Sequence, residues 1–439
     1  MSSEWSKVSL GKVANIFTGF SFKGNEYLMN GVGIRVVRGD NVTEHSLRWG
    51  EKEKRWPSIT EILKPYKLRV GDIVIGMDGS KVGKNFATVT LADGECLLAQ
   101  RVARVRVKDG FDQTYLRYLI CNQLFTEYVQ AVHTGTSIPH ISKGQIEKFE
   151  VWYPPLIQQI NIGLILKSLD DRIALLRETN TTLDAIAQAL FKSWFVDFDP
   201  VRAKQEGREP EGMDADTAAL FPDCLEESEL GLIPKGWRVG TLGESSSINR
   251  GISPKYTEQA GVLVINQKCI RDYILDTSKA RRHDPKQRKI DSRELIVGDV
   301  LVNSTGVGTL GRVAQVLSLD EVTIVDSHVT VVRTGDNLTW NYLGLSMMRR
   351  QGEIESLGEG TTGQTELSRG NLAALSLIIP PKSVLDAFDN ASLHLRDRFV
   401  LNLKLAQTLT AIRDTLLPRL ISGQLRLPEA ETLMDEVGS

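Results

Sequence analysis

The sequence predicts an α+β protein in which a β-rich domain followed by a long helix occurs twice. Three observations support this prediction. Unusual segments recur far apart in the chain, short β-rich runs give way to a helical pattern at a proline pair in each copy, and each helical stretch carries apolar residues every seven positions. We therefore expect a tandem duplication whose two long helices pack on each other.

The composition is that of an ordinary globular protein. Its 439 residues suffice for two or three domains, and the hydrophobic fraction of 41% allows sizeable cores. No apolar run reaches the length of a membrane-spanning helix, and the N-terminal residues lack the pattern of a secretory signal. We expect a cytoplasmic protein with no membrane partner.

The four cysteines are scattered, at Cys96, Cys121, Cys224 and Cys269. They form no C-x-x-C pair and have no histidines at ligand spacing nearby, so neither a disulfide framework nor a metal site is expected.

The charge is distributed unevenly, although the formal net charge is only −2. Residues 199–232 contain ten acidic and three basic residues, whereas residues 268–293 contain nine Lys or Arg against four Asp. The stretch "RWGEKEKRW", residues 48–56, is also basic. Basic patches that could follow a phosphate backbone therefore coexist with an acidic linker, while each patch taken alone is equally well explained as a solvated loop.

The repeat is visible in three pairs of segments, whose corresponding residues lie 226 to 232 positions apart. They are "WSKVSLGKVANIFTG" (5–19) with "WRVGTLGESSSINRG" (237–251), "VGDIVIGMDGSKVGK" (70–84) with "VGDVLVNSTGVGTLGR" (297–312), and "GTSIPHISKGQIEKFEVWYPP" (135–155) with "GTTGQTELSRGNLAALSLIIPP" (360–381). Because the separation is domain-sized and nearly constant, it indicates two diverged copies of one domain.

In each copy the sequence pattern changes once from β-rich to helical, at Pro154-Pro155 and at Pro380-Pro381. Short runs rich in Val and Ile, separated by glycine turns, precede each pair and predict strands, whereas a helical pattern follows it. We expect a first β-rich domain (1–155), a helix (156–198), an acidic linker (199–236), a second β-rich domain (237–381), a second helix (382–427) and an acidic tail (428–439).

Both helical stretches carry a heptad pattern typical of coiled coils. At roughly 35 residues each they would span about 50 Å, so each needs a long partner. The economical solution is that they pack on each other antiparallel; the alternative is that each packs on its own domain. The predicted interface positions are Leu169, Ile173, Leu176, Asn180, Leu183, Leu395, Phe399, Asn402, Leu409 and Leu416. The two asparagines among them would fix register and orientation.

Several of these segments together resemble the specificity subunits of type I restriction-modification systems. The junction "GTSIPHISKGQIEKFEVWYPPLIQQINIGLILKSLDDRI" is similar to the point where a target-recognition domain meets its spacer helix in that family. The opening "WSKVSLGKVANIFTGFSFKG", the post-helix "FKSWFVDFDPVRAK", the second start "ELGLIPKGWRVGTLGE" and the final "LLPRLISGQLRL" also look like that family. The resemblance covers essentially the whole chain.

The resemblance implies a non-catalytic, sequence-specific DNA-binding subunit with two target-recognition domains, each reading half of a bipartite sequence. The coiled coil would act as a ruler and as the docking site for two modification (methyltransferase) subunits. These would bring S-adenosylmethionine and flip out the target adenine, and separate ATP-driven restriction subunits would cleave, so no cofactor is expected on this chain. A pseudo-two-fold protein should read half-sites about one helical turn, roughly 34 Å, apart, and unlike domains should read unlike halves.

The residues expected to face DNA are basic residues within the repeated or charged segments. They are Arg35, Arg38, Lys81, Lys84, Arg281, Arg282, Lys286, Arg288 and Arg312. Charge alone does not separate those that read bases from those that contact phosphates.

Other functions are less well supported. A coiled-coil scaffold with two protein-binding domains and no DNA role is the second hypothesis, and an autonomous enzyme acting on nucleic acid is the third. For a phosphate-binding loop, "GMDGSKVGK" would need glycine at Asp78 and a hydroxyl at Asn85. Asp197 and Asp199 could be imagined as a metal pair, but their place beside Pro200 favours helix termination. The histidines form no repeated triad pattern.

Overall fold

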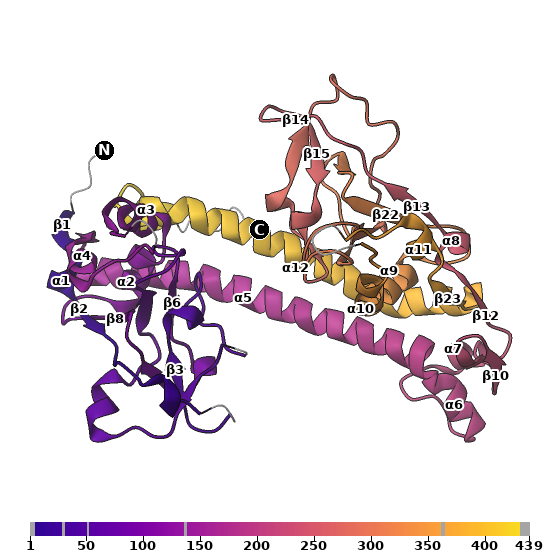
Figure 1. The fold of residues 1–439 in the computed structure, drawn as a ribbon, viewed down its shortest axis with the longest axis horizontal. Coiled ribbons are helices and arrows are strands. Elements are labelled where there is room, and N and C mark those ends of the chain that lie inside the picture. Colours follow the sequence, from indigo (N-terminus) through magenta and orange to yellow (C-terminus); the bar gives the residue numbers. More distant parts are fainter. Residues whose placement is uncertain (1–4, 29–30, 51, 136–137, 361–364, 431–439) are drawn as a thin grey trace. The chain divides into compact units, whose positions relative to one another are not determined.

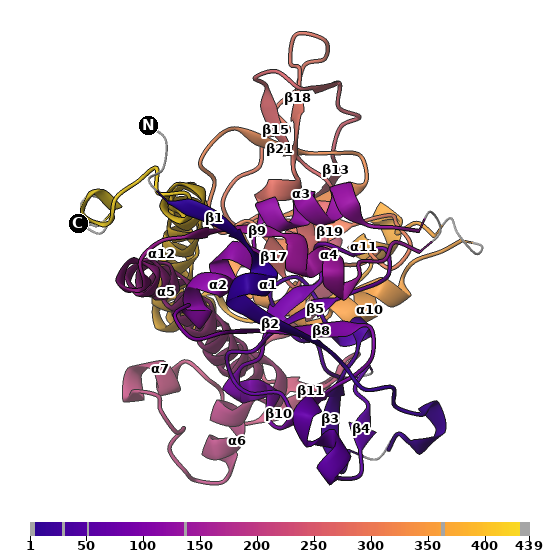
Figure 2. The ribbon, with the colours of Figure 1, turned by 90° about the vertical axis from the view of Figure 1, so that its left-hand side faces the viewer.

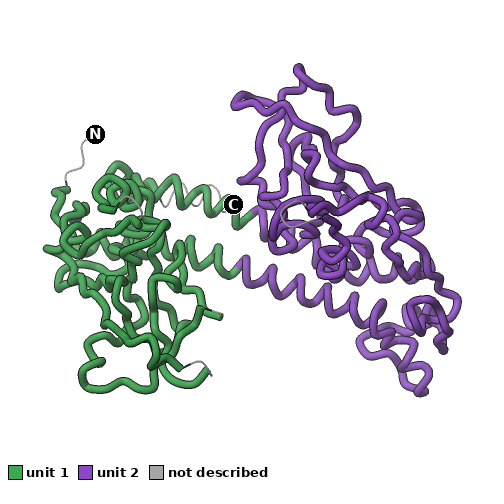
Figure 3. The backbone as a smooth tube through the Cα atoms, viewed as in Figure 1, with its two compact units in different colours: residues 1–175, 405–439 green, residues 176–404 purple. Residues whose placement is uncertain are grey.

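The computed structural model describes residues 5–28, 31–50, 52–135, 138–360 and 365–430. The chain divides into two compact units, coloured separately in Figure 3. Unit 1 comprises residues 1–175 and 405–439, and unit 2 comprises residues 176–404. Each unit therefore combines one β-rich part of the sequence with a stretch of both long helices.

Unit 1 is built on a four-stranded antiparallel sheet with the strand order β2-β8-β5-β6 (Figure 2). A second sheet has the order β4-β3-β7, in which β3 and β7 run parallel. The strand bounds are β2 Ala14–Thr18, β3 Ile34–Val37, β4 Arg55–Trp56, β5 Ile73–Gly76, β6 Phe86–Thr88, β7 Cys96–Leu98 and β8 Val102–Val107. Strand β5 is buried throughout, which accounts for its uninterrupted apolar run.

Unit 2 repeats this topology. Its first sheet has the order β13-β22-β19-β20 and its second the order β14-β18-β15-β21, with β15 and β21 parallel. The strand bounds are β13 Ser246–Arg250, β14 Tyr256–Thr257, β15 Val262–Ile265, β18 Arg281–His283, β19 Val300–Asn303, β20 Val313–Gln315, β21 Thr323–Val325 and β22 Val329–Thr334. The shared strand order confirms the tandem duplication predicted from the sequence.

Short elements surround these sheets. In each unit an antiparallel pair ties the start of the β-rich part to the strand before the prolines: β1 with β9 in unit 1, and β12 with β23 in unit 2. Their bounds are β1 Ser6–Ser9, β9 Glu150–Tyr153, β12 Arg238–Thr241 and β23 Ser376–Ile379. The short helices are α1 Leu10–Val13, α2 Gln113–Ile120, α3 Gln123–Val132, α4 Lys143–Lys148, α8 Leu242–Ser245, α9 Trp340–Arg349, α10 Gln351–Ser356 and α11 Arg369–Ala373. Unit 2 also has the hairpin β16 Ile270–Arg271 with β17 Ile274–Leu275, and its linker forms α6 Asp199–Gln205, α7 Ala215–Ala219, β10 Leu225–Ser228 and β11 Gly231–Pro234.

The repeated Val-Gly-Asp segment builds the same buried ion pair in both units. Both carboxylate oxygens of Asp72 accept hydrogen bonds from the Arg106 guanidinium, at 2.7 and 2.6 Å. Both oxygens of Asp299 accept from Arg333 at 2.7 Å. Paired, two-pronged contacts of this kind are geometrically specific, so they lock β8 and β22 to the turn before the adjacent strand.

The repeated Ser-(Lys/Arg)-Gly segment begins a short helix in both units. The hydroxyl oxygen of Ser142 accepts from the backbone N–H of Gln145 at the start of α4, and that of Ser368 accepts from Asn371 at the start of α11. Serine at this position satisfies a backbone donor that has no partner within the helix. The recurrence of this unusual segment therefore has a structural explanation.

The long helices are α5, Leu156–Lys192, and α12, Lys382–Ile421 (Figure 1). A π-helical turn, Ser193–Asp197, follows α5 directly. Within unit 2 the side chain of Asn402 donates to that of Asn180 at 3.0 Å, and the rings of Phe191 and Phe388 lie 6.0 Å apart. Because the residue number rises along α5 as it falls along α12, the helices are antiparallel, as predicted.

The helices also complete the core of each unit. In unit 1, Leu166 of α5 and Leu420 of α12 are fully buried in one cluster with Tyr115 of α2. In unit 2, Phe388 of α12 is fully buried beside Tyr342 of α9. Packing of helix on helix and packing of helix on domain, which the sequence presented as alternatives, thus occur together. No helix in the described part of the chain is long and apolar enough to cross a bilayer.

Candidate nucleic-acid interface

Equivalent loops meet the repeated glycine-threonine segments in the two units. The carbonyl of Met77, at the start of the β5–β6 loop, accepts from the N–H of Ile141 at 2.8 Å. The carbonyl of Ser304, at the start of the β19–β20 loop, accepts from Leu367 at the same distance. Residues 136–137 and 361–364 of these segments lie outside the described residues. Two sequence motifs are thus brought together in each unit.

The β5–β6 loop carries two of the predicted DNA-facing cations. The side chains of Lys81 and Lys84 are exposed. No contact with another described residue engages either ammonium group. The β19–β20 loop has the same length, but Gly308 and Gly311 occupy the corresponding positions. There the nearby Arg312 donates to the carbonyl of Gly308 at 2.8 Å and is partly buried. The two loops therefore present different charges on the same frame.

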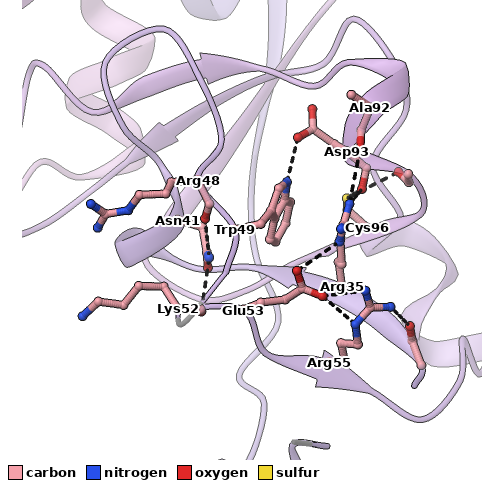
Figure 4. A network of polar contacts seen from close by, with 12 residues as sticks. Arg35, Asn41, Arg48, Trp49, Lys52, Glu53, Arg55, Ala92, Asp93 and Cys96 are labelled. Carbon is pink, nitrogen blue, oxygen red and sulfur yellow. Dashed lines mark hydrogen bonds and ion pairs between the residues drawn. The ribbon is translucent and has the colours of Figure 1, made fainter. Parts of the chain in front are cut away.

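Arg35 on β3 is enclosed by protein (Figure 4). Its guanidinium donates to the carbonyl oxygens of Ala92 at 3.3 Å and Asp93 at 2.9 Å. It also lies 3.4 Å from the carboxylate of Glu53 and stacks over the indole of Trp49 at 4.9 Å. These contacts engage much of the guanidinium, so Arg35 is better placed to organise this surface than to reach a ligand. The DNA contact predicted for it stays a prediction.

Arg38 follows β3 and is closer to solvent. It pairs with Asp40 at 2.7 Å and lies 6.0 Å from the ring of Tyr27. Burial raises the pKa of the Tyr27 hydroxyl, and the charge of Arg38 opposes this shift. An exposed pair of this type is weak and can exchange its carboxylate for another anion.

In unit 2, Arg281 on β18 lies over the ring of Tyr256, 3.4 Å from the ring centre. Its side chain is exposed on one side. Burial raises the pKa of Tyr256, with a further increase from Asp326. Stacking on an aromatic ring orients an arginine side chain without pairing its positive charge with a carboxylate.

Arg282, the next residue on β18, binds other groups of the protein. Its guanidinium binds both carboxylate oxygens of Glu321 and donates to the carbonyl of Gly261 at 3.0 Å. The hydrogen bond to Glu321 raises the pKa of Arg282. The corresponding residue of unit 1, Arg55, makes the same bond to the carbonyl of Gly33 at 2.8 Å. This recurrence indicates a structural contact in both units, and the DNA contact predicted for Arg282 stays untested.

Lys286 and Arg288 lie on a turn that is stabilised by hydrogen bonds to the His283 ring. The buried His283 ring accepts from the N–H of Lys255 through Nδ1 at 2.9 Å, so Nε2 carries the proton and donates to the carbonyl of Arg288 at 2.8 Å. Asp284 accepts from the N–H of Lys286, and this bond lowers the pKa of Asp284. The Lys286 side chain is exposed, while the Arg288 guanidinium donates to a backbone carbonyl at 3.0 Å.

The predicted helix-interface residues lie on inward-facing positions of α5 and α12. Six are buried: Leu169, Ile173, Leu176, Asn180, Asn402 and Leu416. Four are partly buried: Leu183, Leu395, Phe399 and Leu409. Asn180 also donates to the carbonyl of Phe399 at 3.0 Å, so its carboxamide bridges the helices through two bonds.

A polar contact that the heptad pattern did not predict centres on Asp170 of α5. Its carboxylate accepts from Arg117 of α2 and Arg413 of α12, both at 2.9 Å, and from the Tyr118 hydroxyl at 2.8 Å. Burial opposes ionisation, but the hydrogen bonds from Arg413 and Tyr118 and the charge of Arg117 together lower the pKa of Asp170. This carboxylate joins α2 of the β-rich domain of unit 1 to both helices.

The residues weighed for other chemistries have structural contacts. The Asp197 carboxylate pairs with Lys192, and Asp199 begins α6. Burial raises the pKa of the Cys96 thiol to about 12 and that of Cys269 to about 11. Across the described residues, no three His, Cys, Asp or Glu side chains gather as a metal site would require.

Comparisons with known proteins find similarity to one family. Residues 2–185 match the family model for the type I restriction modification DNA specificity domain. Over 357 residues the chain is 25% identical to the type I restriction enzyme MjaIX specificity subunit of Methanocaldococcus jannaschii, covering 78% of this chain and 76% of that protein. It is also 25% identical over 367 residues to the HindI specificity subunit of Haemophilus influenzae, covering 71% of this chain and 77% of that protein. These matches together indicate a type I restriction-modification specificity subunit.

A solved structure has the same fold as this specificity subunit. It is the type I restriction-modification S subunit from M. genitalium, with a TM-score of 0.58. The alignment covers 95% of this chain and 96% of that one at 15% sequence identity. At this identity the likeness concerns the fold.

Sequence reasoning overlooked three exposed cations of this specificity subunit: Arg48, Lys52 and Lys279. They lie within the two basic stretches that the charge count had identified. Neighbouring arginines were chosen instead, because the sequence does not reveal which cations have protein partners.

Proposed function

We propose that this specificity subunit binds double-stranded DNA and reads a bipartite target with its two recognition domains. The proposal rests on the duplicated fold, whose two copies carry equivalent loops with different exposed charges. The strand order of the first sheet is the same in both units, and the Asp72–Arg106 ion pair corresponds to Asp299–Arg333. The exposed charges on the loops between β5 and β6 and between β19 and β20 differ. A shared frame with different surface groups suits two half-sites of different sequence.

The chain would direct methylation and restriction without catalysing either. Modification subunits would supply S-adenosylmethionine and the methyl transfer, and restriction subunits would supply ATP-driven cleavage. The complex would act in the cytoplasm, where the DNA is.

The long helices offer a surface for two modification subunits. Ile157, Leu164 and Ile186 of α5 are 63%, 59% and 48% exposed, although α5 buries its opposite side against α12 and the domains. Large apolar side chains exposed along a long helix are typical of a surface that a partner covers.

Binding to random DNA tests the proposal. The subunit, purified together with a modification subunit, would be incubated with duplexes containing a randomised central region, and the bound duplexes would be sequenced. We expect enrichment of two unlike short motifs at a fixed separation, and affinity that falls steeply with salt. If the complex assembles but enriches no motif and binds DNA no better than the modification subunit alone, the chain is a scaffold instead.

A further inference from the structure

A short segment of unit 1 carries two exposed cations. Hydrogen bonds within the protein hold the backbone and the neighbouring polar side chains of this segment. This segment, here called the strap, consists of Arg48, Trp49, Gly50, Lys52 and Glu53, which precede β4; Glu51 lies outside the described residues. The strap lies beside Asn41, in the turn that follows β3 (Figure 4).

Asn41 holds the strap from beneath. This side chain is fully buried, and its Nδ2 donates to the carbonyl oxygens of Arg48 at 3.0 Å and Lys52 at 3.3 Å. Its Oδ1 accepts from the N–H of Arg38 at 3.1 Å, and its backbone carbonyl accepts from the N–H of Arg48 at 2.8 Å. One buried carboxamide therefore fixes the backbone at both cationic residues.

The other strap residues are anchored by side chains. The indole N–H of Trp49 donates to Asp93 at 2.8 Å, and Glu53 accepts from Arg55 at 2.6 Å and lies 3.4 Å from Arg35. Arg35 thus serves as a support of the strap. A rigid support lowers the entropy lost when side chains on it bind a ligand.

The two cations themselves point away from this network. Figure 4 shows the side chains of Arg48 and Lys52 extending from the strap, and both residues are exposed. Neither charged group is engaged by a side chain or carbonyl in the described part of the chain. Neighbouring cations behave differently, since Arg38 pairs with Asp40 and Arg55 with Glu53.

Unit 2 contains an equivalent strap, residues 276–281, which leads into β18. The N–H of Asp276 donates to the carbonyl of Cys269 at 2.8 Å, matching the bond from Arg48 to Asn41. The carboxamide of Asn266 donates to the carbonyl of Lys279 at 2.9 Å. The exposed cations here are Lys279 and Arg281, so the two straps share a design but differ in the positions of their charges.

We infer that the two straps are DNA-contacting elements, with Arg48 and Lys52 binding the half-site read by unit 1 and Lys279 binding that read by unit 2. The inference rests on the proposed function. Asn41 and Arg35 are positioning residues in this assignment, because they act through the strap. Two cations with no carboxylate partner among the described residues, held on a hydrogen-bonded backbone, suit the regularly spaced phosphates of a duplex.

The test uses the complete complex with its modification subunit and a duplex that carries the motif found for the wild type. The variants are Arg48→Ala, Lys52→Ala, the double variant and Lys279→Ala. Lys12→Ala is the control, since Lys12 is an exposed cation on α1, away from β3 within unit 1 (Figure 1). We expect each strap variant to bind about tenfold more weakly. Loss of two phosphate contacts should reduce the slope of log K against log salt by about 1.8 in the double variant.

Two further readouts separate the possible failures. Thermal unfolding should be unchanged in these variants, because the truncated side chains are exposed. Asn41→Asp retains both strap cations but removes the two donated bonds, and it should weaken DNA binding while Lys12→Ala does not. If the wild-type complex binds its motif but the double variant matches Lys12→Ala in affinity and salt slope, the strap assignment is wrong. If the wild-type complex binds no motif, the proposed function itself fails.

Discussion

Replacing Asp170 by asparagine tests how firmly the recognition domain of unit 1 is joined to the helix pair. The carboxylate receives three hydrogen bonds, from Arg117, Tyr118 and Arg413, and its side chain is 16% exposed. Hydrogen bonds to a charged group contribute about 1.5–3 kcal/mol each. Both arginines are partly exposed, which reduces their share through solvent screening. We therefore expect Asp170→Asn to lower the free energy of unfolding by about 2–3 kcal/mol at pH 7.

The effect of pH follows from the lowered pKa of Asp170. An acid whose pKa is lower in the folded state stabilises the fold above its unfolded pKa, about 3.9, and this stabilisation is lost as the pH falls through the folded pKa. The difference between wild type and Asp170→Asn should accordingly shrink below about pH 4. Urea denaturation, with hydrogen exchange of α2 peptides as a second readout, measures both the loss of unfolding free energy at pH 7 and its dependence on pH.

The neighbouring Asp171 provides a matched control. It is also on α5, but its side chain is 63% exposed and, among the described residues, forms an ion pair with Lys167 alone. Asp171→Asn should change the unfolding free energy by less than about 0.5 kcal/mol. Equal effects of Asp170→Asn and Asp171→Asn at pH 7 would refute the reasoning, since they would mean that the three bonds contribute nothing beyond a surface charge.

Three further predictions concern the helix pair and the β5–β6 loop, which we propose faces DNA. Asn402→Ala should cost about 1–3 kcal/mol because it removes a bond inside the helix pair, whereas leucine at both Asn180 and Asn402 should restore or exceed wild-type stability; a double-mutant cycle by urea denaturation decides this. Phe388→Ala should cost about 3–5 kcal/mol, since the fully buried ring leaves a cavity, and an unchanged denaturation midpoint would contradict the packing. Replacing both Lys81 and Lys84 by alanine should lower the slope of log K against log salt for DNA binding by about 1.8, as measured by titration at several salt concentrations. An unchanged slope would mean that this loop does not contact DNA.

The duplication and the helix pair could be predicted because their signals are local in sequence. Repeated segments such as those around Asp72 and Asp299 recur at a constant separation, and each recurrence has a structural cause in a buried ion pair or a helix cap. The heptad pattern likewise gives the helix face directly. It cannot show that α5 and α12 also complete the core of each domain, because that packing joins residues distant in the chain.

The residues proposed to face DNA were harder to choose for the same reason. Arg35 and Arg282 were selected by charge, but their partners lie 14 to 58 residues away in the chain. Conversely, Arg48 and Lys52 belong to the basic stretch 48–56, which also contains glutamates. Only the fold reveals that Glu53 is committed to Arg35 and Arg55. Net charge over a segment therefore says little about which cations are available to DNA.

The most direct test of the central claim is whole-genome mapping of adenine methylation by single-molecule sequencing. Cells supplying a type I modification subunit would be compared with and without this chain. We predict a new methylated motif with two unlike halves around a fixed gap, present only when the chain is expressed. An unchanged methylation pattern, with the modification subunit active and bound to the chain, would contradict the account.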